Sequence, residues 1–431
     1  MLTDTEATEW AVELLSMRKK DSAHLDRIRN YWRGKQPLPI MVPRTGVPTE
    51  VRRMAEMSRI NVVALPIDVV GQALYVDGYR QERSEKNEAV WDVWQANKMD
   101  ARQIGVHRAS LAYGASYVTV LPGDPAPVVR GRSPRTLTVA YGEDDVWPVY
   151  ALERQKGLRG VVTWRLFDEE SVYTFRDDPK ERKPGAVWAG EWQKTEEHGL
   201  GVCPVVRFRN TGDLDDEDEV MGEIAALIPL QDQMDFTTFD LLVAQHYQAF
   251  RQRYVMGWTS PSESDKAKAS ASRLWTFDDP DTKVGEFGQT DLKGYIESRE
   301  STLTHLAVIS QTPPHYLLGK LVNLSAEALA AAEAGQQRKV AQRETTFGES
   351  WEMVFGLAAA AMDEKVTDGA QVRWRDTEAR SLASTVDALG KMAQMLNVPP
   401  QMLWEQIPGW TQQDVDRAKA IAAGMPVPPK L

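Results

Sequence analysis

The sequence has one cysteine, Cys203, in 431 residues. A single thiol cannot form a disulfide within the chain, which excludes a disulfide scaffold and fits a reducing compartment. Cys203 stands just before a proline and a β-branched stretch, and no Cys/His signature surrounds it. We therefore predict a packed strand residue and not a nucleophile. The six histidines show no metal-ligand spacing, so no metal site and no cofactor are predicted.

Long apolar runs are also missing. No stretch of about 18 apolar residues occurs, so no membrane-spanning helix is expected. The first ten residues are polar and acidic, and we expect no secretory signal there. Basic residues are outnumbered, 51 Lys and Arg against 62 Asp and Glu, for a net charge of −11. This balance argues against a broad basic face that grips nucleic acid, but it is compatible with DNA sliding past.

The sequence contains no common catalytic or phosphate-binding motif. G-x-x-x-x-G-K-[ST], G-x-G-x-x-G and G-x-S-x-G are all missing. The acidic block at 213–219 does not fit a calcium loop, because Asp218 and Ile224 stand where Gly and Glu are required. A chain of this size without a recoverable site favours a structural protein over an enzyme.

What is present is the composition of a globular protein with two or three domains. Hydrophobic residues make up 42% and charged residues 26%, which suffices for a substantial core. Fourteen tryptophans are scattered without a period, which indicates core and interface anchors. The class expected from the coarse pattern is α+β, mostly helical.

The chain is organised around residues 291–362. Asp291 is a plausible N-cap for a helix over 292–310, and the Pro-Pro pair in 311–315 ends that helix. A short apolar loop follows to residue 324, with Lys320 as its only charge. Ser325 then caps a helix that the pattern carries to residue 362, a length of roughly 55 Å.

That long helix is small at one end and bulky at the other. Its first half is rich in alanine, and its second half carries Phe347, Trp351 and Phe355. The pattern suits a place where copies crowd together at one end only. An ordinary helical hairpin in a core has the same spacing, so the pattern of this helix does not distinguish contacts between copies from packing within one chain.

The N-terminal part predicts helices first and strands later. Apolar spacing and caps indicate helices over 4–33, 49–57, 61–74, 87–96 and 100–113, with a turn at 76–79. β-Branched and aromatic residues then indicate strands over 117–121, 136–140, 161–167, 171–175 and 205–209. We expect a mostly antiparallel β-subdomain there.

A small module is inserted between two helices. The first helix is expected over 219–254, with Pro229 kinking or restarting it, and the second begins near Asp291. Between them, a capping box at Ser260–Glu263 opens a short helix, and strands are expected over 274–277 and 283–287. Flanking helices of this kind lie side by side, with the module at their far end. Strand-like residues at 372–376 and helices over 378–396, 400–406 and 411–423 complete the chain.

Several short stretches, taken in order, carry a resemblance to a known family. They are Asn61-Val-Val, Gly71-Gln-Ala-Leu-Tyr-Val-Asp-Gly-Tyr79, Leu111-Ala-Tyr-Gly-Ala-Ser-Tyr-Val118, Phe208-Arg-Asn210, Leu230-Gln-Asp-Gln-Met234, Ser310-Gln-Thr-Pro-Pro-His-Tyr-Leu317, Asn323-Leu-Ser-Ala-Glu-Ala-Leu329 and Trp374-Arg-Asp376. With these, the chain resembles the portal proteins of tailed bacteriophages over roughly residues 50–420. The branch is the one typified by a Bacillus siphophage and common in actinobacterial phages. The order of the pieces, with a module between two helices, makes the resemblance specific.

The resemblance implies a portal fold that assembles as a ring, usually a dodecamer. Its implied parts are a wing (1–218, β-rich from about 115), a first stem helix region (219–257), a clip (258–290), a second stem helix (291–310), a tunnel loop (311–324), a long helix behind the channel (325–362) and C-terminal wing or crown helices (363–431). Such a ring stands at one capsid vertex as the head–tail connector. Viral double-stranded DNA is packaged through it by a terminase and is later ejected through it.

The same resemblance implies roles for individual residues. The DNA channel would be lined at the tunnel loop by Gly319, Lys320, Leu321 and Asn323, where Lys320 would contact phosphate transiently and without reading sequence. The clip and its partner interface would involve Trp258, Lys266, Lys268, Arg273, Trp275 and Phe277. Solvated positions for the lysines and the arginine are the alternative to DNA or partner contact.

The implied partners are further copies of the chain, the terminase large subunit, major capsid and scaffold proteins, head-completion or adaptor proteins and DNA of any sequence, without a membrane. The implied location is the portal vertex of the virion, and the host cytoplasm during assembly. Two other classes stay open from the sequence: an enzyme with an unrecognised site, and a capsid-associated interaction protein that forms no ring.

Overall fold

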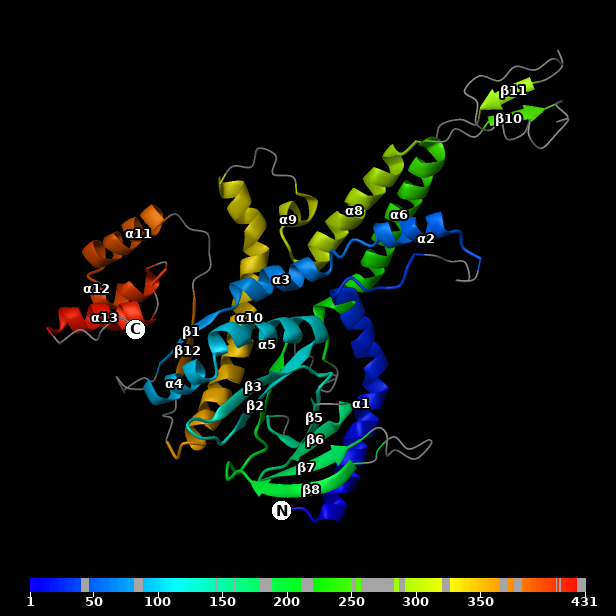
Figure 1. The fold of residues 1–431 in the computed structure, drawn as a ribbon. Coiled ribbons are helices and arrows are strands. Elements are labelled where there is room, and N and C mark those ends of the chain that lie inside the picture. The colour runs from blue at the N-terminus through cyan, green and yellow to red at the C-terminus, as the bar shows by residue number, and fades with distance from the viewer. Residues whose placement is uncertain are drawn as a thin grey trace.

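The computed structural model describes residues 1–39, 46–80, 88–143, 146–157, 160–178, 188, 190–210, 220–249, 253–256, 283–286, 291–319, 326–364, 370–375, 382–407, 409–410 and 412–424. Within these ranges the fold mixes helices with open antiparallel sheets, as the sequence predicts. A helical and β-rich body carries two long helices that project from it (Figure 1).

The N-terminal helices follow the predicted order. They are α1 (Asp4–Trp32), α2 (Thr49–Ser58), α3 (Ala64–Ala73), α4 (Glu88–Ala96) and α5 (Met99–Tyr113). The Thr3 side chain caps α1 by accepting from the Glu6 N–H, and the Glu6 carboxylate accepts from the Thr3 N–H in return. The predicted boundaries agree with the observed ones to within about three residues, because the caps and the apolar spacing coincide.

The β-rich part forms two sheets in which every pairing is antiparallel. The three-stranded sheet has the order β3-β2-β9, and the five-stranded sheet has the order β4-β5-β6-β7-β8. The strands are β2 (Ala115–Leu121), β3 (Val128–Arg132), β4 (Leu137–Tyr141), β5 (Pro148–Lys156), β6 (Val162–Phe167), β7 (Ser171–Asp177), β8 (Gly190–Glu197) and β9 (Val205–Arg209). The sequence pattern missed β3, β5 and β8, of which β8 has four charged residues among its eight.

A buried carboxylate joins the two sheets. Glu153 on β5 is fully buried and accepts a hydrogen bond from Arg165 Nε on β6 at 2.9 Å. The same carboxylate is paired with Arg132, which comes from β3 of the other sheet. Cys203 is buried in a core with Ala151 and Phe167, as the sequence predicts, but it precedes β9 and is not a strand residue.

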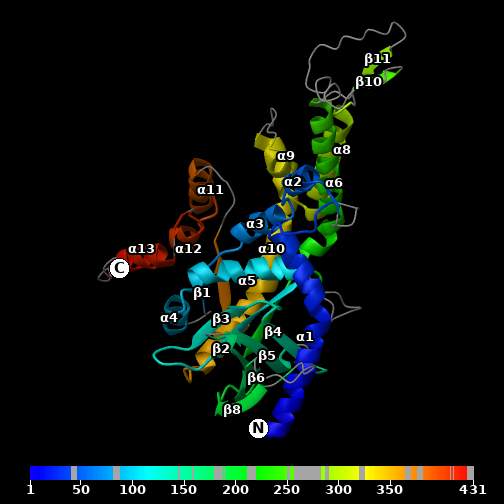
Figure 2. The same ribbon diagram turned by 45° about the vertical axis from the view of Figure 1, so that its right-hand side comes forward.

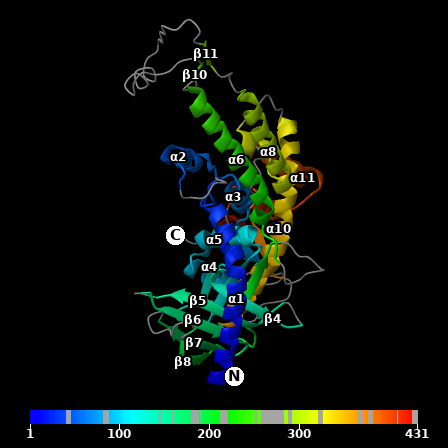
Figure 3. The same cartoon turned by 90° about the vertical axis from the view of Figure 1, so that its right-hand side faces the viewer.

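Helix α1 covers one face of the five-stranded sheet (Figure 3). Its buried stripe of Ala7, Ala11 and Leu14 belongs to the same core as Leu152 and Trp164 of the sheet. Residues spaced by three and four along a helix share one side, which is why a single stripe spans the sheet.

The larger core lies around the long helix α10 (Ala326–Ala360). The bulky half of that helix buries Phe347, Trp351 and Phe355 against α3, α4, α5 and β1. The bulky residues therefore fill the core of the chain's own body.

The predicted turn at 76–79 is wrong. These residues form strand β1 (Val76–Arg80), which pairs antiparallel with β12 (Gln371–Trp374). An irregularity in the register between Val76 and Gly78 is consistent with the turn-like Asp-Gly pair. The partner strand is almost 300 residues away in the sequence, so a local pattern could not reveal the pairing.

The C-terminal helices stand to one side of the body (Figure 2). They are α11 (Leu382–Met395), α12 (Pro400–Leu403), the 3-10 turn η2 (Trp404–Gln406) and α13 (Gln412–Ala422). Met395, Leu396 and Met402 on these elements are more than half exposed. This lobe thus presents apolar side chains to its surroundings.

Candidate stem and channel elements

Two long helices form the projecting stem. Helix α6 (Glu223–Ala249) and helix α8 (Lys293–Ser310) lie side by side and rise from the body together (Figures 1 and 3). Pro229 lies inside α6, so the predicted interruption is accommodated within one helix. The Asp291 carboxylate accepts from the Lys293 N–H at 2.9 Å. The N-cap of α8 is Leu292, however, whose side chain makes no capping hydrogen bond, so the predicted N-cap at Asp291 is wrong by one residue.

A short β-hairpin ladder lies at the far end of this stem (Figure 1). Strand β10 (Arg253–Met256) pairs antiparallel with β11 (Lys283–Glu286). The predicted helix to residue 254 is therefore wrong at its end, where the Tyr-Val pair follows a strand preference. The predicted strand at 283–287 is present, and its partner is 253–256. The expected partner at 274–277 lies outside the described residues.

A buried ion cluster fastens the base of the stem to α10. Lys339 Nζ on α10 lies 2.5 Å from Glu223 Oε2 at the start of α6, and donates to the Ser310 carbonyl at 3.0 Å. Arg343 Nη2, one turn further along α10, lies 3.3 Å from Glu223 Oε1. Arg343 Nε donates to Asn210 Oδ1 at 2.7 Å. Both cations are at most 6% exposed, so the carboxylate serves as their common counterion.

This cluster connects four segments that are remote in sequence. Glu223 opens the first stem helix, Ser310 ends the second, and Asn210 follows β9. The cations come from one face of α10, because their spacing of four residues is about one helical turn. Asn210 and Ser310 each stand in a stretch that carries the family resemblance, but no local pattern in the sequence points to Glu223, Lys339 or Arg343.

The segment after α8 is partly helical. Gln311 ends α8 in the left-handed conformation with φ 54°, as the proline signal predicted. A short helix, α9 (Pro314–Leu318), then occupies residues that the sequence assigned to a loop. Pro314 accounts for it, because proline is favoured in the first turn of a helix even though it ends the preceding one.

Two side chains of α9 meet α10 at the same carboxylate. His315 Nε2 lies 3.8 Å from Glu333 Oε1, and the side chains are 10% and 24% exposed. Burial and a hydrogen bond to Glu333 raise the pKa of Tyr316. We call this trio the α9 clasp. It holds the last described residues before 320–325 against the first part of α10.

Of the predicted channel and clip residues, Gly319 alone lies within the described residues. Gly319 ends α9 with φ 63°, a left-handed conformation that favours glycine. The other predicted site residues lie outside the described residues: Lys320, Leu321 and Asn323 of the loop, and Trp258, Lys266, Lys268, Arg273, Trp275 and Phe277 of the clip. Their roles stay predictions.

Two glycines set the backbone where the stem leaves the body. A Cβ on Gly222 would lie 2.3 Å from the Ala112 carbonyl oxygen, and a Cβ on Gly114 would lie 2.4 Å from the Val220 carbonyl oxygen. Gly114 also has φ 97°. The end of α5 and the approach to α6 thus touch backbone to backbone, and only glycine permits this distance.

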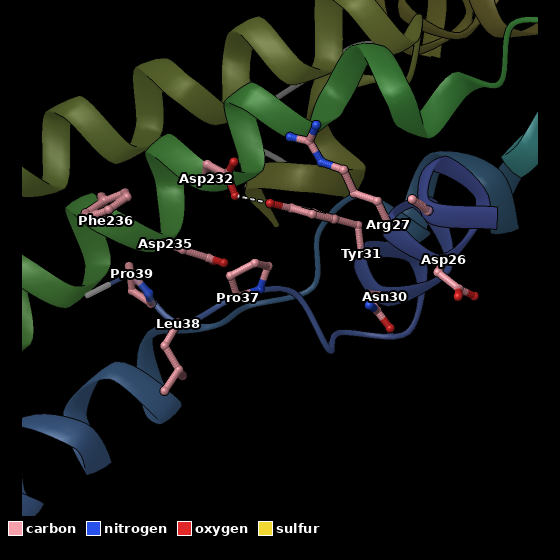
Figure 4. A pocket seen from close by; sticks show the side chains of 11 residues that line it. Asp26, Arg27, Asn30, Tyr31, Pro37, Leu38, Pro39, Asp232, Asp235 and Phe236 are labelled. Atoms are coloured by element: carbon pink, nitrogen blue, oxygen red, sulfur yellow. Dashed lines mark hydrogen bonds between the residues drawn. The ribbon is translucent and has the colours of Figure 1, made fainter. Parts of the chain in front are cut away.

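A hollow of about 540 Å³ lies between α1, the segment 37–39 and α6 (Figure 4). Tyr31 donates to Asp232 Oδ1 at 2.5 Å across it. Asp235 accepts from Gln36 Nε2 at 2.9 Å, and the Ile60 N–H lies 3.3 Å from its other oxygen. Burial raises the pKa of Asp235. Both carboxylates fasten the N-terminal segments to α6, which makes the hollow a structural joint.

Within the described ranges, no group of three or more His, Cys, Asp or Glu side chains could hold a metal ion. No helix in the same ranges has both the length and the apolar character needed to cross a membrane.

The family model described as "Phage portal protein, SPP1 Gp6-like" matches residues 16–424. The chain belongs to this family of phage portal proteins. Two curated relatives are named "Portal protein". The one from Mycobacterium phage D29 is 25% identical over 375 residues, which cover 80% of this chain and 75% of the relative. The one from Mycobacterium phage L5 is 26% identical over 378 residues, which cover 80% and 74%.

Two solved structures are also similar. The neck of an empty GTA particle, computed with C6 symmetry, matches with a TM-score of 0.48 at 10% identity, over 90% of this chain and 96% of the other. The neck of a native GTA particle, computed with C12 symmetry, gives 0.47 at 9% identity, over 88% and 95%.

Membership in the family fixes the general role. A portal protein is a structural component of the virion at a capsid vertex and is not an enzyme. The resemblance inferred from the sequence is thereby confirmed, and the open alternatives of an enzyme and a capsid protein of another kind are set aside.

Proposed function

We propose that this portal protein forms a closed ring, a dodecamer, through which double-stranded DNA is packaged and later ejected. The observation that carries the proposal is the order of elements in a member of the portal family: stem helix, terminal hairpin, stem helix, loop and long helix. A ring places the stem helices of all copies around one axis. The net charge of −11 favours sliding over sticking when a duplex passes.

Ring contacts need surfaces that one copy leaves uncovered. The exposed Met395, Leu396 and Met402 of the C-terminal lobe, together with Val308 and Ile309 on α8, supply apolar side chains at two separate places on the chain. Exposed apolar groups of this kind are typical of surfaces that another protein covers. The neighbouring copy is the partner that a closed ring provides.

The remaining partners follow from the portal role. We propose that the stem end with β10 and β11 meets the terminase large subunit during packaging and head-completion or adaptor proteins afterwards. The body contacts the major capsid and scaffold proteins, and assembly takes place in the host cytoplasm. Lys320 touches DNA phosphates in passing, as a contact without sequence information.

The deciding experiment is the native mass of the purified protein by light scattering, with negative-stain images of the same peak. We expect a mass near that of a dodecamer and annular views with a central hole. A monomer or dimer at every concentration and ionic strength, with and without scaffold protein, would contradict the ring. A packaging assay with Lys320→Ala then tests the channel contact, with the exposed Lys194→Ala on β8 as a matched control.

A further inference from the structure

Helix α1 carries one arginine in the otherwise apolar stripe that faces the five-stranded sheet. The buried stripe Ala7, Ala11 and Leu14 covers the five-stranded sheet, and the next position of the stripe is Arg18. Arg18 lies over the Trp164 ring, with its guanidinium carbon 5.7 Å from the ring centroid. An arginine thus stands where the helix pattern calls for an apolar residue.

A second arginine faces Arg18 from the sheet. Tyr150 and Leu152 of β5 both pack in the core beneath α1, and alternate residues of a strand share a face. Arg154 therefore lies on the same face, and it is paired in register with Trp164 of β6. No hydrogen bond or ion pair of the Arg154 side chain exists among the described residues.

A third arginine closes the group. Arg18 Nη2 donates to the carbonyl oxygen of Arg135, in the turn before β4. The Arg135 guanidinium is bound by Asp26, through Nε at 3.1 Å. The charge of Asp26 stabilises the protonated form of Arg18. The positive charges of Arg154 and Arg135 destabilise it. Among the described residues, Arg18 thus has two arginines and one carboxylate as charged neighbours, and that carboxylate is already bound by Arg135.

The group has unfilled hydrogen-bonding capacity at its centre. Arg18 Nη1 is buried and has no hydrogen-bond partner among the described residues. Burial and the two neighbouring arginines lower the pKa of Arg18 to about 10, against an ordinary value of 12.5. Arginine stays charged at neutral pH even so, and a partly buried guanidinium with more positive than negative neighbours is unfavourable.

We propose that Arg18, Arg135 and Arg154 form a binding site for a phosphate oxyanion between α1 and the five-stranded sheet. Planar guanidinium groups bind phosphate oxygens in pairs, and converging groups raise both affinity and specificity. The ligand is free inorganic phosphate or a phosphate of the DNA backbone, which offer the same oxygens. The proposal does not depend on the ring or on the packaging role.

The test measures thermal unfolding of the purified full-length protein against inorganic phosphate, with sodium chloride of equal ionic strength as reference. We expect a saturable rise in the unfolding midpoint of about 1–2 °C for the wild type when phosphate exceeds its dissociation constant tenfold. Arg154→Gln removes a partly exposed contact, and we expect at least tenfold weaker binding by calorimetric titration. Arg176→Gln, on β7 and outside the group, is the matched control and keeps the response.

A second variant distinguishes the site from a merely structural arginine. Arg18→Met keeps the long apolar stem and removes the buried charge. We expect a higher unfolding midpoint than the wild type without phosphate, and no further rise when phosphate is added. A lower midpoint with an intact phosphate response would overturn the proposal, as would a wild type that responds to phosphate and chloride alike.

A DNA arm identifies the source of the phosphate. Binding of a short duplex is followed by fluorescence anisotropy as a function of salt. If the backbone is the ligand, Arg154→Gln lowers the affinity and reduces the salt slope by about one contact. If inorganic phosphate binds and the duplex affinity is the same in the variant and the wild type, the ligand is the free ion.

Discussion

Trp351 and His107 are hydrogen-bonded to each other at the centre of the larger core. Trp351 Nε1 donates to His107 Nε2 at 2.8 Å, and His107 Nδ1 lies 3.1 Å from the Leu74 carbonyl oxygen. Because Nε2 accepts, Nδ1 carries the proton, and the ring is neutral with both nitrogens satisfied. This pair joins α10 to α5 and fixes the register of the long helix in the body.

The first prediction removes the donor of this pair. Trp351→Phe leaves His107 Nε2 buried without a partner, so we expect a loss of about 1–3 kcal/mol in the free energy of unfolding. Urea denaturation at fixed protein concentration measures it. Trp192→Phe, a partly exposed tryptophan on β8, is the control and should change little. Equal losses in the two variants would contradict the role of the pair.

The second prediction concerns pH. Burial lowers the pKa of His107 to about 3, against 6.5 for a free side chain. Between these values the unfolded chain binds a proton that the folded chain does not, so stability falls as the pH drops from about 6.5 towards 3. The slope due to this group approaches 1.4 kcal/mol per pH unit well below pH 6.5, which amounts to about 1.6 kcal/mol between pH 6.5 and 5.

A variant isolates this contribution from other titrating groups. Burial also lowers the pKa of His198, whereas it raises the pKa of Glu352 and Asp235, and these shifts affect the slope in opposite directions. His107→Gln keeps a donor and an acceptor but cannot titrate. We expect a shallower decline of the urea midpoint from pH 6.5 to 5 than in the wild type. Parallel curves would show that His107 does not titrate as described.

The third prediction concerns the buried cluster at the stem base. Glu223→Gln leaves Lys339 and Arg343 without a carboxylate, and breaking a buried ion pair in this way costs about 3–5 kcal/mol. Asp387→Asn is the matched control, because its pair with Lys391 is exposed on α11 and contributes less than about 0.5 kcal/mol. Similar unfolding midpoints for the two variants would mean that the cluster does not hold the stem to α10.

The fourth prediction compares two glycines, one crowded by neighbouring backbone atoms and one with open space around it. Gly222→Ala forces a Cβ against the Ala112 carbonyl oxygen, which cannot retreat, and should destabilise the fold by about 1–3 kcal/mol or more. A Cβ on Gly335, inside α10, meets nothing within 4 Å, so Gly335→Ala should stabilise the fold by about 0.5–1 kcal/mol. Thermal unfolding of both variants measures the signs, and the same sign in both would contradict the packing described.

Local signals in the sequence predicted much of the fold. The cap at Thr3, the Pro-Pro stop after Ser310 and the spacing of Phe347, Trp351 and Phe355 act within a few residues, so they place α1, α8 and α10 correctly. Pairing between distant segments has no such signal. The strand at 76–80 was predicted as a turn because its partner lies at 371–374.

For the functional site, too, the family could be predicted from the sequence, whereas contacts between distant segments could not. The resemblance identified the portal family, which the family match confirms. The ion cluster was missed, because Glu223 on α6 and the cations Lys339 and Arg343 on α10 become recognisable only when these two remote helices are brought together. Gly114 and Gly222 left a signal in the sequence as glycines at element boundaries, but their close approach could be inferred only from the fold.

The fifth prediction concerns the α9 clasp. Glu333→Gln removes the charge that faces His315 and weakens the acceptor of Tyr316, so α9 should separate more readily from α10. Because these side chains are partly exposed, global stability should change by less than about 1 kcal/mol. Local opening should rise instead, which hydrogen exchange of the amides in 315–319 detects.

Glu297→Gln, in an exposed pair with Lys293 on α8, is the control and should leave that exchange unchanged. Faster exchange across the whole of α10 would contradict a local clasp. Exchange confined to α9 would locate the least stable point of the stem base beside the loop that we assign to the channel.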